Sequence, residues 1–258
     1  MQMIVLMVFA VVLSLGSSPG PRLLTAGWPP LAAATLLYLG VTALLTAWIT
    51  RIGVRRLLRA EGAFTATVHR HHRRLLIVQV WLVAGVAGLL AIGLTDRFVA
   101  SPYLQAVPLL AEGVLLGVFL AALVIHWAIS YRFDRMVRWQ VEQDLMLAGM
   151  PVRSGWSLGE YLGFNLRHHF LFVAVPVGLI MLAHDVVDRA AAALPSGPSA
   201  VAAVLVVKAA SVAMVFFFSP ALLIRVWRTR PLPDGPLRRR LERLCRRIGL
   251  RYRQIRIW

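Results

Sequence analysis

The sequence predicts an all-α integral membrane protein of about six transmembrane helices, followed by a short helix–strand extension. Two observations lead to this fold class. Hydrophobic residues make up 59% of the chain, against about half in an ordinary globular domain, and the mean hydropathy is +0.72. These residues also gather in runs that approach the roughly 20 residues a helix needs to cross the bilayer core. The six runs cover residues 3–16, 31–50, 75–93, 107–129, 169–183 and 200–224.

The first run, residues 3–16, allows two interpretations. It is short, and small residues and prolines follow it at 17–21, as they do near the cleavage site of a secretory signal. However, no Lys or Arg precedes it, whereas a signal has a positively charged start. We therefore favour a retained helix over a cleaved signal and leave both open.

The positive charge alternates along the chain. The formal net charge is +17, which in a soluble chain would suggest nucleic-acid binding. Here the arginines follow the second, fourth and sixth runs, and the other connections carry almost none. The positive-inside rule then predicts cytoplasmic N- and C-termini. We expect a protein of the bacterial inner membrane whose partners include anionic lipid headgroups and exclude nucleic acid.

The connections on the arginine-rich side are long enough for structure of their own. Residues 51–74 could form a cytoplasmic helix that leaves and re-enters the membrane. Residues 131–150 predict an outward extension of the fourth helix, which residues 149–155 break. Ser157 and Glu160 have the spacing of a capping box and predict the start of a further short helix.

Few ionisable residues lie inside the runs. Glu112 and Lys208 fall in the same outer half, and we expect them to form a structural ion pair between two helices; a transport or proton path is the alternative. The histidines at 69–72, and His126 with His168 and His169, do not form a persuasive ligand set beside so many arginines. We assign no catalytic residue, no metal ligand and no cofactor to this chain.

The stretch from Ser219 to Trp258 leaves the membrane. Residues 231–235 predict a turn, Asp234 could cap the helix that follows, and Gly249 could end it. Residues 250–257 have a broken period-two pattern that fits a strand. The helix carries one apolar stripe on an arginine-covered surface, and we predict this stripe as a docking face: Leu237, Leu241, Leu244 and Ile248.

The run from Ser219 to Trp258 resembles the segment that joins the membrane helices to the protease domain in a family of zinc metallopeptidases. This family comprises the CAAX prenyl endopeptidases and the HtpX-type proteases. The resemblance implies a catalytic domain with the motif His-Glu-x-x-His and a zinc ion. No His-Glu pair occurs in the 258 residues, so no catalytic or zinc-binding position is carried over.

The resemblance implies that residues 1–224 are the membrane domain of a metalloendopeptidase and that 225–258 begin a catalytic domain missing from this chain. As it stands, the chain would not be catalytic, and zinc would belong to the missing domain. The main alternative is a non-enzymatic membrane anchor or assembly protein whose basic tail docks a cytoplasmic partner. A transporter subunit, resting on Glu112 and Lys208, is a third.

Overall fold

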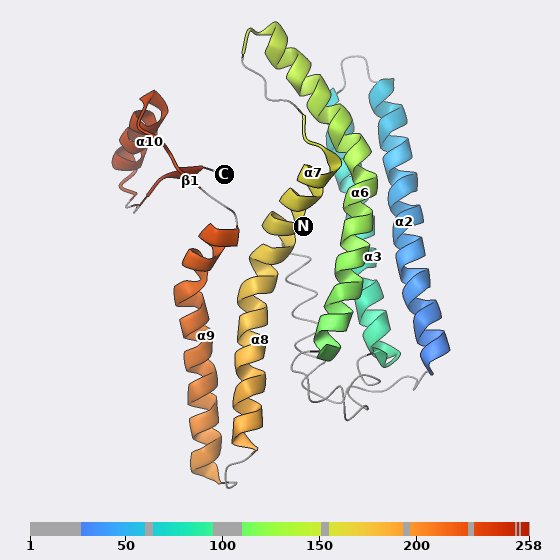
Figure 1. Ribbon diagram of the computed structural model, residues 1–258. Helices are drawn as coiled ribbons and strands as arrows, with labels where there is room; N and C mark the ends of the chain where they lie inside the picture. Colours follow the sequence, from blue (N-terminus) through green and yellow to red (C-terminus); the bar gives the residue numbers. More distant parts are fainter. Residues whose placement is uncertain are drawn as a thin grey trace.

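The computed structural model describes residues 27–59, 64–94, 110–150, 155–192, 197–226, 230–250, 252 and 254–257. Long helices alternate in direction along the molecule (Figure 1). They are α2 (Trp28–Leu58), α3 (Phe64–Ala91), α6 (Leu110–Leu147), α8 (Phe172–Ala191) and α9 (Pro198–Val226). The short helix α7 (Leu158–Asn165) and a π-helical turn η1 (Leu166–Leu171) lead into α8. A tail module follows α9 and consists of β1 (Arg230–Pro231), α10 (Pro236–Arg247) and β2 (Arg256–Ile257).

Five helices in the described part of the chain are long and apolar enough to span a membrane. The predicted runs two to six each overlap one of these helices, and runs two and five fall wholly within theirs. The first predicted run, residues 3–16, lies outside the described residues, so the total of six spans stays a prediction. The protein is therefore a polytopic helical membrane protein. The spans are Trp28–Leu58, Phe64–Ala91, Gly113–Leu147, Leu158–Ala191 and Ser199–Ser219.

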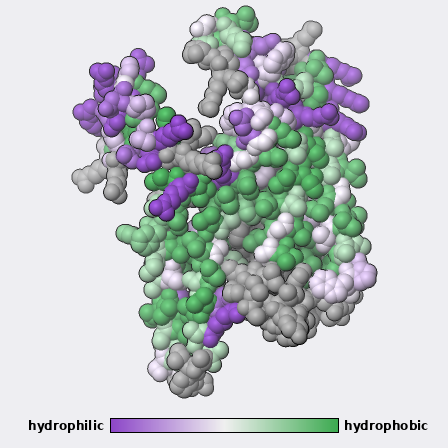
Figure 2. Space-filling model, viewed as in Figure 1, coloured by the Kyte–Doolittle hydropathy of each residue, from purple (hydrophilic) through white to green (hydrophobic). Residues whose placement is uncertain are grey.

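The helices are longer than a bilayer requires. The 38 residues of α6 extend about 57 Å at 1.5 Å per residue, whereas the hydrocarbon core is about 30 Å thick. On α2, the exposed Trp28 and Trp48 are separated by about 30 Å of helix, which suits aromatic residues at the two membrane interfaces. The arginine-bearing ends of α2 and α6 then extend beyond the apolar belt. Figure 2 shows hydrophobic side chains over the middle of the visible face and hydrophilic ones over α10 and the upper ends of the helices.

One prediction about these ends is wrong. Residues 51–74 do not form a separate helix: residues 51–58 continue α2, and α3 begins at Phe64. The reason is that adding a residue to an existing helix costs far less than nucleating a new one.

The buried residues form one cluster, which extends from α2, α3 and α6 through α7 and η1 to α8. In it α2 packs on both α3 and α6, and α3 also contacts α6, whereas α9 packs on α8. On α3 the buried residues Val78, Leu82, Val86 and Leu89 form one stripe. By contrast, none of the apolar window of α9 is buried. Within a bilayer, such a surface is stable because lipid chains are as apolar as the side chains they contact.

Residues adjacent in the sequence stabilise the end of α6 and the start of α7, as the sequence predicts. Gly149 follows α6 with φ +68°, and the amides of Gly149 and Met150 donate to the carbonyls of Met146 and Leu145, a glycine-dependent helix end. Ser157 and Glu160 form the predicted capping box at the start of α7. The chain therefore reverses direction between α6 and α7 through two separately stabilised ends.

The structure of the tail module confirms the predicted end of α10 but not the predicted cap. Gly249 has φ +67° after α10, and the amide of Leu250 donates to the carbonyl of Cys245. Asp234 is not the helix cap, because Gly235 occupies that position and the Asp234 carboxylate pairs with Arg238 instead. The predicted strand at 250–257 is reduced to β2, which pairs antiparallel with β1.

Candidate functional site

Aromatic and hydroxyl side chains form hydrogen bonds across the interface of α2 with α3. The Tyr38 hydroxyl donates to the carbonyl of Leu82 at 3.1 Å, and Nε1 of Trp81 donates to Oγ1 of Thr42 at 3.0 Å. The Tyr38 ring lies against Gly85, where a Cβ atom would come within 2.1 Å of it. The glycine thus allows the two helices to approach, and the hydrogen bonds fix their register.

The interface of α2 with α6 contains a buried polar contact. Oγ1 of Thr46 lies 3.2 Å from Nδ1 of His126, and both residues are buried. Toward the arginine-rich end, the buried ring of His71 stacks on Phe133 with 3.6 Å between ring centroids. Gly53 of α2 leaves room for His71. These contacts join α2, α3 and α6 and give the two buried histidines a packing role.

The described residues contain no group of three His, Cys, Asp or Glu side chains placed to hold a metal ion. The histidines that the sequence singled out make local contacts instead. Nδ1 of His72 donates to the carbonyl of Val68, and Nδ1 of His168 donates to the carbonyl of Phe164. The ring of His169 lies 6.5 Å from that of Trp127.

Lys208 forms an ion pair that the sequence did not predict. Its Nζ lies 2.6 Å from a carboxylate oxygen of Asp188, and this contact joins α9 to the end of α8. The side chain of Glu112 lies outside the described residues, so its predicted pairing with Lys208 is not tested. Asp185 in turn pairs with Arg189 one turn along α8 at 3.0 Å.

The arginine-rich end is the clearest candidate for a functional surface. In the described chain, every arginine except Arg189 lies at the end where α2, α6 and α9 finish and α3 and α7 begin. Arg138 of α6 stacks over Trp156 at 4.1 Å and faces Tyr161 at 5.4 Å. The hydroxyl of Tyr161 donates to the carboxylate of Asp134. These contacts dock α7 against the projecting half of α6 and hold that end in one arrangement.

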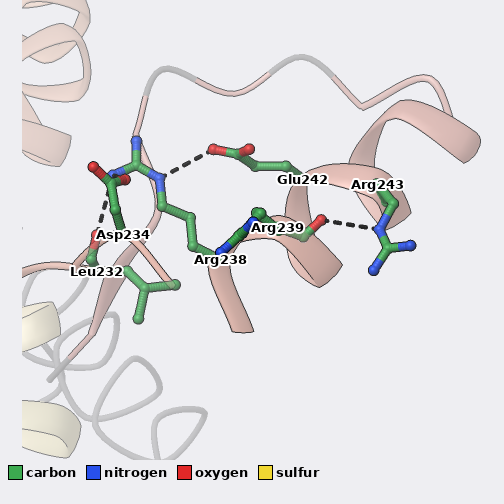
Figure 3. A network of polar contacts seen from close by, with 6 residues as sticks. All are labelled: Leu232, Asp234, Arg238, Arg239, Glu242 and Arg243. Atoms are coloured by element: carbon green, nitrogen blue, oxygen red, sulfur yellow. Dashed lines mark hydrogen bonds and ion pairs between the residues drawn. The ribbon is translucent and has the colours of Figure 1, made fainter. Parts of the chain in front are cut away.

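In the tail module, Arg238 joins the turn to the helix (Figure 3). Its guanidinium group donates to Glu242 at 3.0 Å and to the carbonyl of Leu232 at 3.2 Å, and it pairs with Asp234 at 2.8 Å. The hydrogen bond to Glu242 and the charge of Asp234 raise the pKa of Arg238 above its usual value. Leu232 is buried beneath this network. The module therefore has its own small stabilising centre.

The predicted docking face on α10 is open in this structure. Leu237, Leu244 and Ile248 are 59%, 52% and 63% exposed, and Leu241 is half-buried. Leu250 and Ile257 add further exposed apolar surface on the same module. Exposed apolar clusters beyond the ordinary scatter of single residues mark interaction sites.

Sequence reasoning missed two groups of contacts. One is the packing of Tyr38 on Gly85, and the other is the stacking of Arg138 on Trp156 and Tyr161. The second had a weak signal, because aromatic residues follow the break after α6 and cationic side chains stack readily on aromatic faces.

Comparisons with protein families, with curated proteins and with solved structures find no match to this chain.

Proposed function

We propose that this chain is an integral membrane docking protein whose tail module binds a folded protein domain at the arginine-rich face of the membrane helices. The observation that supports this proposal is the open apolar face of α10 beside a two-stranded sheet whose outer edges pair with no other described strand. The positive-inside rule favours a cytoplasmic position for this face. The helices anchor the module, and the module selects the partner.

The sheet favours a protein partner over insertion into lipid. β1 and β2 have two residues each and pair only with one another in the described chain. A two-stranded sheet is marginally stable alone, and its outer edges carry backbone groups that hydrocarbon cannot satisfy. A partner domain can satisfy them by adding a strand, which is a common mode of recognition.

The charge of the module indicates the chemistry of the partner. Exposed arginines surround the apolar face of α10, and Arg240 and Arg247 flank it on one side. A complementary surface would be apolar at its centre and acidic at its rim, since opposite charges steer association and fix the orientation. We expect the association to weaken with salt for the same reason.

The resemblance to membrane metallopeptidases suggests a specific partner of this kind, namely a zinc-dependent catalytic domain. Such a domain would bring its own zinc ligands and its own general base. This chain would then hold the catalytic domain at the membrane surface, close to membrane-bound or membrane-emergent substrates.

The test uses the full chain in its native membrane. A photo-crosslinking amino acid replaces Leu244, and a matched control replaces Leu147 at the exposed end of α6. We expect position 244, and not position 147, to crosslink to one protein. Binding of that protein to the purified chain should fall at least about 30-fold when Leu237 and Leu244 are both changed to Glu, whereas Leu147→Glu should leave it unchanged.

Two results would overturn the proposal. Crosslinking of position 244 to lipid alone would show that α10 lies on the membrane surface. Equal loss of binding in the Leu147→Glu control would show that the α10 face is not the contact. Zinc-dependent proteolysis by the isolated complex would identify the partner as the expected catalytic domain.

A further inference from the structure

A groove of about 1100 Å³ runs between α2 and α6 at the arginine-rich end of the molecule. Leu158, at the start of α7, lies at its border. The groove is separate from the tail module, since none of the described residues of α9, α10 or the sheet lines it.

Apolar and cationic side chains line the groove in a similar order along both helices. On α2 the lining residues are Ala47, Thr50, Arg51, Val54 and Arg55, which share one helical face because they recur every three to four residues. The facing helix α6 runs in the same direction as α2 (Figure 1). Its lining residues also begin with apolar side chains and continue with two arginines, followed by Met136 and Trp139: Ala128, Ile129, Tyr131, Arg132, Arg135, Met136 and Trp139.

Four arginines therefore line the groove, two from each helix. Arg51, Arg55, Arg132 and Arg135 are all exposed, and in the described chain none of them has an ion pair or hydrogen bond. Other arginines of the chain differ: Arg138 of α6 stacks on two aromatic rings, and Arg238 of the tail module pairs with two carboxylates. Four like charges in one groove repel each other, and a bound anion would relieve that repulsion.

The depth of the groove indicates where the anion comes from. Arg51 lies about one turn beyond Trp48, whose side chain is exposed, as tryptophans at the membrane interface are. The cationic part thus lies at headgroup level, and the apolar part, with Ala47 and Ala128, lies toward the bilayer core. A ligand that fits both parts has an anionic head and an apolar chain.

We infer that this groove binds an anionic phospholipid, whose phosphate lies among the four arginines and whose acyl chain lies against the small apolar residues of α2 and α6. The lipid would neutralise the positive charge of the facing arginines and would contact both helices. This inference does not rest on the proposed docking function, because the tail module has no part in it.

Native mass spectrometry of the full chain in detergent tests the inference, with phosphatidylglycerol and phosphatidylcholine as the two lipid probes. We expect the wild-type chain to bind phosphatidylglycerol more tightly by at least about tenfold, since each arginine near an anionic group contributes about fivefold in affinity. Changing Arg55 and Arg132 to Gln should lower that affinity about 25-fold. Changing Arg56 and Arg73 to Gln is the matched control, because both are exposed arginines of the same end that do not line the groove, and it should have little effect.

A second variant tests the apolar part without changing the charge. Ala128→Phe would fill the groove below the arginines, and we expect it to weaken the binding of phosphatidylglycerol while circular dichroism stays unchanged. Glycerol 3-phosphate serves as a soluble headgroup without a chain, and we expect it to compete poorly.

Three results would overturn the inference. They are equal affinity of the wild-type chain for the two lipids, equal loss of affinity in the Arg56 and Arg73 control, and displacement of the lipid by glycerol 3-phosphate at similar concentration. The last result would reveal a site for soluble anions.

Discussion

The packing of Tyr38 on Gly85 makes a sharp prediction about how α2 and α3 associate. In Gly85→Ala, the new Cβ would lie 2.1 and 2.2 Å from two carbons of the Tyr38 ring, whereas carbon atoms in contact lie about 3.5–4.0 Å apart. The ring is buried, and moving it would break the hydrogen bond from its hydroxyl to Leu82. Overpacking of this kind costs about 2 kcal/mol, and the lost hydrogen bond costs about 1 kcal/mol more.

The matched control is Gly88→Ala, because Gly88 lies one turn along α3 and a Cβ added there would meet no atom of the described residues within 4 Å. Both variants change the intrinsic helix propensity equally, so the difference between them isolates the contact with Tyr38. We expect Gly85→Ala to be less stable than Gly88→Ala by about 3 kcal/mol. The measurement is unfolding of the purified protein by sodium dodecyl sulfate in mixed micelles, followed by tryptophan fluorescence and circular dichroism.

A second substitution checks the cause. Tyr38→Leu removes the ring that the new Cβ would meet, so Gly85→Ala should cost much less in a Tyr38→Leu background, with a coupling free energy of about 2 kcal/mol. Equal stability of Gly85→Ala and Gly88→Ala, within about 0.5 kcal/mol, would refute the close approach of α2 and α3 at this level.

Three further substitutions test individual contacts. Gly149→Ala should destabilise the end of α6 by about 1–2 kcal/mol because its φ is +68°, seen as faster amide exchange in the last turn; unchanged exchange would contradict the left-handed end. Ser157→Ala should cost α7 about 1 kcal/mol by removing the cap, also read from amide exchange, and Ser157→Thr should restore most of it. Thr46→Val should lower the free energy of unfolding by about 1–3 kcal/mol because His126 would lose its buried partner; an equal loss in Thr46→Ser, which keeps the hydroxyl, would exclude this hydrogen bond as the cause.

The spanning helices could be predicted from the sequence for a simple reason. A chain segment in hydrocarbon must satisfy its backbone hydrogen bonds internally, so an apolar run of sufficient length becomes a helix. The helix ends at Gly149, Ser157 and Gly249 were predictable as well, because each depends on residues adjacent in sequence. The apolar stripe of α10 followed from helical periodicity alone.

The sequence did not predict contacts that depend on a competing side chain or on residues of another helix. Asp234 could have capped α10, but the side chain of Arg238 lies close enough to pair with it. Lys208 is paired with Asp188 across the α8–α9 interface, a contact that periodicity does not reveal. The groove combines arginines of α2 with arginines about eighty positions later on α6, and no local pattern links the two sets.

The sequence by itself determined the arrangement of the chain across the membrane: which segments are long and apolar enough to span it, and at which end the arginines gather. Each of these depends on the transfer of individual segments or charges between water and lipid. Only the tertiary structure decided the lateral arrangement, namely that α2 packs on both α3 and α6, that Tyr38 faces Gly85, and that a cationic groove forms between α2 and α6. In lipid all apolar surfaces are nearly equivalent, so neighbours are selected by small residues, close packing and a few buried hydrogen bonds, whose fit appears only when the helices are side by side.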